Sequence, residues 1–262
     1  MIRWTDAHNH FADPRLAGLP DLWRSTRAAG VSRMIVNATC EADWPAIDHL
    51  AAENPAVIPA FGIHPWKAAD VSNGWQERLA ALLAKYPRAT VGEIGVDGWV
   101  AEPGFEIQIP LFETQLRLAR ELRRPCMIHC LKVWQPLFDS FDRQSPPEKF
   151  LMHSFAGSLE IARRLIPLGA YFSFSGYFLH PWKAKILEIF RQLPKDRILL
   201  ETDAPDMLPP SEFITHPLPE NHNHPANLPA IGEALAHHLG ISPEELAILT
   251  GENLTNFLAT DH

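Results

Sequence analysis

Asp6, His8 and His10 stand two residues apart in the stretch WTDAHNHFADP, close to the start of the sequence. On a β-strand, residues two apart point to the same face, so these polar side chains share one side of a run that is otherwise apolar. Burying polar groups is costly unless hydrogen bonds or a metal ion satisfy them. The spacing therefore predicts either a hydrogen-bonded cluster or a metal site.

Other histidines and carboxylates stand within apolar runs or at their ends further along the chain. They are His64 in GIHP, Glu93 in VGEIG, His129 in CMIHC, His153 in LMHS, and Glu201 and Asp203 in ETDAP. Each one alone is more often a hydrogen-bonded core or loop residue than a metal ligand. Together, imidazole and carboxylate groups suit hydrolytic zinc, manganese or magnesium sites. The set therefore predicts a metal site, at which Asp6 orients a ligand or anchors its strand. The predicted ligands are His8, His10, Glu93, His129, His153 and Asp203.

The elements that would position these residues alternate between strands and helices. Apolar, β-branched runs predict strands at 2–8, 33–39, 57–65, 90–97, 126–130, 149–154, 170–176 and 197–203. Amphipathic stretches predict helices at 20–29, 44–53, 75–86, 105–123, 133–144, 158–169, 183–193, 227–240 and 243–259. Eight such units in 262 residues predict an α/β fold, a (β/α)8 TIM barrel with one extra C-terminal helix. A doubly wound sheet is the main alternative, but it does not usually place polar residues at so many strand ends.

Composition and charge limit the classes of protein that the sequence fits. Hydrophobic residues make up 46% of the chain, which is enough for one large core, and we expect a single domain over 1–262. The net charge of −8 gives no basic footprint for nucleic acid, although bound divalent ions would add positive charge that this count omits. No run approaches the ~18 apolar residues of a membrane span. Three scattered cysteines form no disulfide framework, so we expect a soluble, cytoplasmic protein without a membrane partner.

Several longer motifs follow one another in a specific order. They are DAHNHF, FGIHP, VGEIGVD, PCMIHC, HSFAGS, YFSFSG and ILLETDAP, with a helix that contains Gln108 and Gln115 and a closing NLPAIGEALAHHLGISPEEL. Through these motifs the chain resembles, nearly end to end, the TatD-related metal-dependent hydrolases. These proteins are also called TatD-type deoxyribonucleases and belong to the amidohydrolase superfamily.

The resemblance implies a site for two divalent metal ions, which would be zinc, manganese or magnesium. It implies that His8, His10 and Asp203 hold one ion, that His129 and His153 hold the other, and that Glu93 bridges both. A pair of ions can position and acidify a water molecule and stabilise charge on the reacting oxygens.

The resemblance also implies catalytic roles for three residues. Asp203 would be the general base, kept ionised by the adjacent cation. Glu201 would pair with a ligand histidine or contact the substrate, and its structural alternative is a buried pair. His64 would contact the substrate or the transition state, and its structural alternative is a cap for the turn before Pro65.

Departures from the family pattern bear on the substrate. Cys130, Leu131 and Lys132 follow His129, where the family has Ser or Thr and then a basic and an acidic residue. His224, in HNHPAN, stands where the family has Glu, and residues 204–230 contain no Lys or Arg. The basic groups that would hold phosphates are therefore few.

Three functions follow from these observations. The first is a deoxyribonuclease that cleaves phosphodiester bonds from single-stranded or frayed DNA ends with a two-metal-activated water. For it, Trp66, Lys67, Trp99 and Trp134 are candidates for holding bases and phosphates. The second is a hydrolase of a small ester, amide or phosphoester, favoured by the acidic balance. The third is a catalytically silent metal-binding or scaffold protein, against which the complete ligand set argues.

Overall fold

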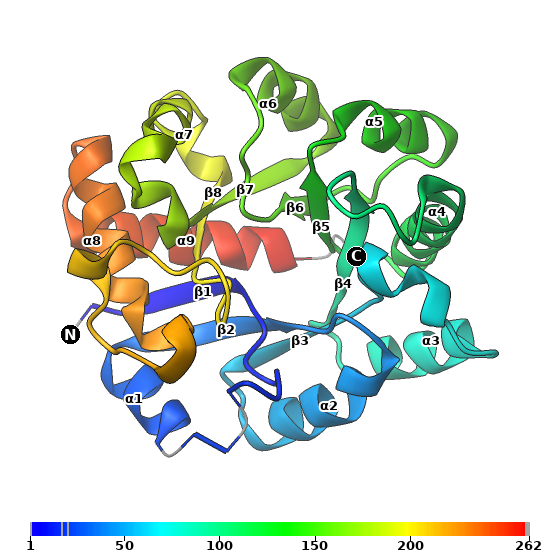
Figure 1. Ribbon diagram of the computed structural model, residues 1–262, viewed down its shortest axis with the longest axis horizontal. Coiled ribbons are helices and arrows are strands. Elements are labelled where there is room, and N and C mark those ends of the chain that lie inside the picture. Colours follow the sequence, from blue (N-terminus) through cyan, green and yellow to red (C-terminus); the bar gives the residue numbers. More distant parts are fainter. Residues whose placement is uncertain (1, 17, 20, 260–262) are drawn as a thin grey trace. The chain divides into compact units, whose positions relative to one another are not determined.

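The computed structural model describes residues 2–16, 18–19 and 21–259 (Figure 1). Its strands are β1 (Trp4–Asn9), β2 (Val31–Asn37), β3 (Val57–Phe61), β4 (Thr90–Asp97), β5 (Cys126–Leu131), β6 (Phe150–Met152), β7 (Ala170–Ser175) and β8 (Ile198–Glu201). Its α-helices are α1 (Leu22–Ala28), α2 (Trp44–Glu53), α3 (Trp75–Lys85), α4 (Phe105–Glu121), α5 (Trp134–Arg143), α6 (Leu159–Leu165), α7 (Ala184–Phe190), α8 (Leu228–Leu239) and α9 (Pro243–Leu258). In the described part of the chain, none of the helices combines the length and apolar character that crossing a membrane requires.

The strands form one sheet in the order β1 to β8. Neighbouring strands pair in parallel, as β4 does with β5 and β7 does with β8. The sheet returns to its start, because the Asp203 N–H donates to the His8 carbonyl (3.0 Å) and the His10 N–H to the Ala204 carbonyl (2.7 Å). A parallel sheet of this kind with a helix after each strand is a (β/α)8 TIM barrel. Because α8 completes the eighth unit and α9 is an additional helix, the predicted fold class is confirmed.

The chain divides into two compact units. Unit 1 comprises Met1–Val36, Ser154–Arg163 and Phe172–Asn256. Unit 2 comprises Asn37–His153, Arg164–Tyr171 and Phe257–His262. The single domain expected over residues 1–262 stays a prediction.

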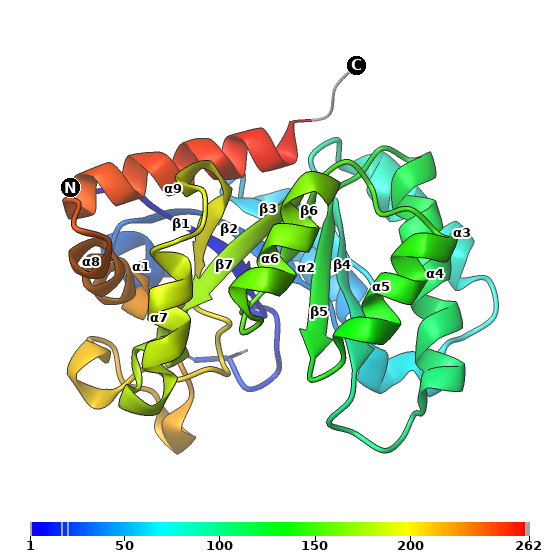
Figure 2. The same ribbon diagram turned by 90° about the horizontal axis from the view of Figure 1, so that it is seen from above.

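In unit 1 the core forms between β1, β7, β8 and the helices beside them. Every residue of β1 is buried, as expected for a strand that is covered on both faces. Trp4 packs so closely on α8 that a Cβ atom at Gly232 would lie 2.4 Å from its ring. Within this unit, α9 lies at the end where β1 begins, and the loop after β8 lies at the end where β1 finishes (Figure 2). The strand-end residues of unit 1 are therefore on the side away from α9.

In unit 2 the longest helix, α4, holds two strand ends through buried glutamines. Gln115 accepts the Ile63 N–H (2.8 Å) and donates to the Ile63 carbonyl (3.0 Å). Gln108 accepts the Asp97 N–H (2.8 Å) at the end of β4. Buried amides are retained when they are hydrogen-bonded in this way. The glutamines of the family motif thus fix the backbone next to His64 and at Asp97.

Candidate metal centre

In unit 1, His8, His10 and Asp203 form a group that we call the histidine–aspartate cluster. His8 Nε2 lies 3.4 Å from Asp203 Oδ1, and His10 Nε2 lies 3.5 Å from the same oxygen. One ligand atom from each residue lies within 4.8 Å of the other two. His8 is fully buried and Asp203 is 8% exposed. Two imidazoles and one carboxylate that converge in this way are a donor set that fits a divalent metal ion.

Asp6 positions this cluster through the backbone. Its carboxylate accepts hydrogen bonds from the Thr202 N–H (3.0 Å), the Thr202 hydroxyl (2.6 Å) and the His8 N–H (3.3 Å). Burial raises the pKa of Asp6 to about 6, although these hydrogen bonds act in the opposite direction. Asp6 thus connects β1 to Thr202, the residue before Asp203. The φ of Asp203 is 53°, which lies in the left-handed region. Non-glycine residues in this region are concentrated at functional sites.

In unit 2, Glu93, His129 and His153 form a second group, which we call the histidine–glutamate cluster. Glu93 Oε1 lies 3.1 Å from His129 Nδ1 and 2.7 Å from His153 Nε2. The two imidazole nitrogens lie 3.1 Å apart. Glu93 is 2% exposed, so its carboxylate is shielded from solvent beside two imidazoles. This donor set also fits a divalent metal ion.

Asp97 orients the His129 ring. Its Oδ2 accepts hydrogen bonds from His129 Nε2–H (2.8 Å) and from Trp66 Nε1–H (2.8 Å), and its Oδ1 accepts the Trp99 N–H (2.6 Å). Burial alone would raise the pKa of Asp97, but these hydrogen bonds outweigh it and lower the pKa to about 2. Burial lowers the pKa of His129, but hydrogen bonds to Asp97 and Glu93 raise it to about 9. With Nε2 held by a carboxylate, His129 directs Nδ1 to the cluster, where a bound ion would replace the proton.

His64 lies beside the histidine–glutamate cluster. Its Nδ1 accepts the Trp66 N–H (3.2 Å), so the side chain caps the short helix that begins at Pro65. Its Nε2 lies 3.4 Å from Glu93 Oε1. Because Nδ1 accepts a hydrogen bond, Nε2 carries the proton of the neutral ring. The structure shows the capping role, and the contact with substrate stays a prediction.

Glu201 is fully buried at the end of β8 and bound to two serines. The Ser154 N–H donates to Oε1 (2.8 Å), and the hydroxyls of Ser154 and Ser173 also donate to this carboxylate. These contacts are the buried pairing that the sequence left as the alternative for Glu201. Its predicted contact with a ligand histidine or the substrate stays a prediction.

The sequence patterns did not single out Asp97, although a signal was present. Glu93, Gly95 and Asp97 alternate along β4, which is the same period of two that drew attention to Asp6, His8 and His10. Gly95 between them is required by the close approach of β5, since a Cβ atom would lie 1.9 Å from the His129 carbonyl oxygen. The two carboxylates on this face therefore meet His129 from the neighbouring strand.

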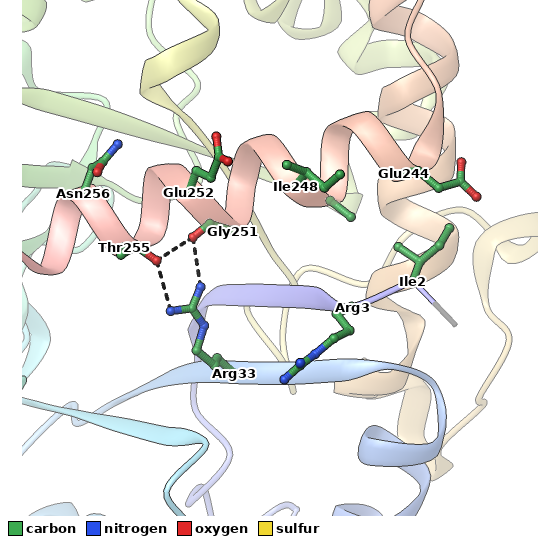
Figure 3. Close-up of a pocket in the computed structure, with 10 residues that line it drawn as sticks. Ile2, Arg3, Arg33, Glu244, Ile248, Gly251, Glu252, Thr255 and Asn256 are labelled. Carbon is green, nitrogen blue, oxygen red and sulfur yellow. Dashed lines mark hydrogen bonds between the residues drawn. The ribbon is translucent and has the colours of Figure 1, made fainter.

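A pocket in unit 1 is separate from the histidine–aspartate cluster. This pocket of about 680 Å³ lies between α9 and the starts of β1 and β2 (Figure 3). The Arg33 guanidinium closes part of it by donating to the Gly251 carbonyl (2.9 Å) and to the Thr255 hydroxyl (3.2 Å). Arg3, at the start of β1, also lines it, whereas His8 and His10 stand at the other end of that strand. The pocket is therefore not part of the candidate metal centre.

A (β/α)8 barrel with imidazole and carboxylate clusters at its strand ends defines a class, the metal-dependent hydrolases. Residues 5–259 match the family described as "TatD related DNase", and the chain belongs to this family. It is a metal-dependent hydrolase that acts on ester bonds.

Similar proteins carry related descriptions. The chain is 34% identical over 211 residues to the uncharacterized metal-dependent hydrolase YjjV of Escherichia coli K12, covering 79% of this chain and 81% of YjjV. It is 29% identical over 230 residues to the 3'-5' ssDNA/RNA exonuclease TatD of Citrobacter rodentium, covering 86% of each chain. The crystal structure of the E. coli TatD homologue YjjV superposes with a TM-score of 0.88 at 28% identity over 98% of both chains.

Proposed function

We propose that the protein is a two-metal nuclease that removes nucleotides from the ends of single-stranded or frayed DNA. The observation that carries this proposal is the presence of two convergent donor sets, the histidine–aspartate and the histidine–glutamate cluster. We assign one divalent ion to each cluster, with zinc, manganese and magnesium all compatible with nitrogen and oxygen donors. Relatives described as 3'-5' ssDNA/RNA exonucleases support the substrate class.

When bound, divalent ions supply charge stabilisation for phosphoryl oxygens and lower the pKa of water. The protein's own groups do the remaining work. Asp203 accepts the proton of the attacking water as general base, because its carboxylate lies at the histidine–aspartate cluster and is held by the turn after β8. His64 Nε2–H donates to an oxygen of the phosphodiester. Glu201 positions Ser154 and Ser173 around the end of β8.

Exposed tryptophans in unit 2 could hold the bases of a single strand. Trp99 is 67% exposed, and Lys132 Nζ lies 5.3 Å from its ring. Trp66 is 47% exposed, but its indole N–H is committed to Asp97. Aromatic faces beside basic side chains are the usual means by which proteins bind single strands without reading their sequence. Trp99 is the stronger of these two candidates for stacking.

The test is cleavage of end-labelled single-stranded DNA with Mg²⁺ or Mn²⁺ by the wild type, Asp203→Asn and Asp142→Asn. Asp142 is an exposed carboxylate on α5 and serves as the matched control. We expect the wild type and Asp142→Asn to release mononucleotides and Asp203→Asn to lose at least about 100-fold in rate, as expected for a general base. Absence of release by the metal-loaded wild type would contradict the nuclease function.

One observation favours hydrolysis of a small ester, amide or phosphoester instead. The loop over residues 204–230 contains no Lys or Arg, and its His224 stays neutral because burial, together with the nearby His216, lowers its pKa to about 4. This loop therefore offers no lysine or arginine to a polyanion, and no charge at His224. Activity on small esters or amides, with none on DNA, would support this second function.

A further inference from the structure

The segment that follows β7 carries an exposed tryptophan that is held in place from one side. Trp182 is 68% exposed. Its ring stacks on the His180 ring with a centroid separation of 4.2 Å and an interplanar angle of 17°. A single exposed aromatic residue is ordinary on a protein surface. The nearly parallel stack of His180 on Trp182 distinguishes this residue from an ordinary exposed aromatic. The imidazole covers one face of the indole and leaves the other face for a ligand.

His180 is itself fixed, so the stack has a defined orientation. Its Nε2 lies 3.2 Å from the Leu208 carbonyl oxygen, to which it donates, and the Tyr177 ring packs edge-on at 5.1 Å. The backbone is held by short helical turns on both sides of His180, the second beginning at Pro181. An aromatic surface that is ordered before binding loses little conformational entropy when a ligand stacks on it.

The stack belongs to the same side of unit 1 as the histidine–aspartate cluster. Ser175, the last residue of β7, pairs in register with Glu201 of β8, and Asp203 follows two residues later. Leu208, which accepts the hydrogen bond from His180, is in the loop that follows β8 and contains Asp203. In Figure 2 the segment after β7 and the loop after β8 extend from the strand ends away from α9. The stack is thus placed at the strand ends where the chemistry is proposed.

Two lysines that follow Trp182 in the sequence favour an anionic ligand. Lys183 Nζ lies 5.3 Å from the Tyr177 ring, and Lys185 is exposed on the first turn of α7. Arg15, which follows β1 in the same unit, is different, because it forms a bidentate pair with Asp206 (2.8 Å to each oxygen) and also pairs with Asp13. Its charge is therefore balanced by two carboxylates. The lysines beside the aromatic stack combine a flat apolar face with positive charge, as single-strand binding surfaces do.

We propose that His180 and Trp182 form a base-binding platform, on which a nucleobase of single-stranded nucleic acid stacks against the exposed indole face. The proposal rests on the proposed nuclease function and names the part of unit 1 that holds the strand. Because every base has a flat face, the platform accepts any base and confers no sequence preference.

The experiment compares two fluorescein-labelled oligonucleotides of equal length, oligo(dT) and an oligomer with the same phosphates but abasic sugars. Binding is measured by anisotropy with proteins that all carry Asp203→Asn, so that the strands stay intact. The variants are Trp182→Ala and Trp182→Phe. The control is Ile248→Ala, because Ile248 is 62% exposed in the same unit but lies on α9. Circular dichroism checks the fold of each variant.

We expect Trp182→Ala to weaken oligo(dT) binding about tenfold and to leave the weaker binding of the abasic oligomer unchanged. Trp182→Phe should retain most of the affinity, and Ile248→Ala should retain all of it. Equal losses on both oligomers, or no loss on either, would overturn the platform.

Cleavage by the enzyme with Asp203 intact separates this proposal from the proposed function. Cleavage of oligo(dT) without any effect of Trp182→Ala on binding or KM would overturn the platform and leave the nuclease function standing. Base-dependent binding through Trp182 without cleavage would support the platform and contradict the nuclease function. Absence of both binding and cleavage would contradict both.

Discussion

At the scale of single residues, the geometry of the histidine–glutamate cluster depends on a carboxylate that is not itself a candidate ligand. Asp97 holds His129 Nε2 at 2.8 Å and also fixes the backbone at Trp99. An asparagine would keep the size of the side chain but lose the charge that favours this orientation of the ring. We expect Asp97→Asn to weaken metal binding at this cluster about 10- to 100-fold. Calorimetric titration of the metal-free protein with Mn²⁺ measures this, with Asp142→Asn as the control. Unchanged affinity would show that His129 needs no such partner.

His224 makes the stability of the protein depend on pH. Its Nδ1 accepts the Ala226 N–H (2.8 Å) and its Nε2 lies 2.9 Å from the Ser25 hydroxyl oxygen. Burial, and then the neighbouring His216, lower its pKa to about 4 from the ordinary 6.5. Between these values the unfolded chain binds a proton that the folded chain does not, so the stabilisation is complete above pH 6.5 and is lost as the pH falls toward 4.

The matching experiment is urea unfolding of the wild type and His224→Gln at pH 7.5 and pH 4.5. Because the side chain is only partly shielded from solvent, we expect the wild type to lose about 1–2 kcal/mol more than the variant over this interval. A smaller loss in the wild type than in the variant would contradict the lowered pKa.

At the scale of elements, the helices and strands were predicted well from the sequence, because the pattern of apolar residues along each element reflects which of its residues are buried. The predicted ranges 44–53 and 90–97 coincide with α2 and β4. The predictions ran past the carboxyl ends of β2, β3, β6, β7 and β8; β3, for example, stops at Phe61 and β8 stops at Glu201. The residues that follow, up to His64 and Asp203, are still buried, so burial continues after the strand pairing has ended. The pattern of burial shows which residues face the interior, but it does not show where the hydrogen-bonded pairing between strands ends.

The contact between β4 and β5 depends on a glycine. A Cβ atom at Gly95 would lie 1.9 Å from the His129 carbonyl oxygen, which belongs to the backbone and cannot rotate away. We expect Gly95→Ala to destabilise the protein by more than about 3 kcal/mol, because the strands would have to separate. Gly240→Ala is the control: Gly240 also has a positive φ of 70°, but no atom lies within 4 Å of its Cβ position. That substitution should cost only about 1 kcal/mol. Urea unfolding compares the two variants, and equal costs would mean that the close approach is not limiting.

At the scale of the whole molecule, the strands and the candidate site residues that they carry could be predicted from the sequence, whereas the strand ends and the side-chain partnerships could not. The spacing of two residues between polar positions and the order of the motifs are sufficient to identify every residue of the histidine–aspartate and histidine–glutamate clusters. The sequence could not show that Asp97 holds His129 or that Ser154 and Ser173 hold Glu201. These partners come from different strands and loops, so only the folded arrangement determines which carboxylate meets which donor.

Metal binding should stabilise the whole fold, since the donors of each cluster come from segments that are far apart in the chain. His8 and Asp203, for example, meet only in the folded protein. An ion that binds only the folded state at 100 times its Kd adds about 2.7 kcal/mol. For a chain of this size, that corresponds to a rise in Tm of roughly 5–10 °C per site.

Calorimetry in EDTA and in excess Mn²⁺ tests this expectation. The wild type should show the largest rise in Tm, and His8→Ala and His153→Ala should each lose about half of it, because each removes a ligand from a different cluster. Ile248→Ala, which alters an exposed residue of α9, should show the full rise. The same Tm for the wild type in EDTA and in Mn²⁺ would mean that the clusters hold no ion tightly. A rise that survives both histidine substitutions would mean that the ion binds elsewhere.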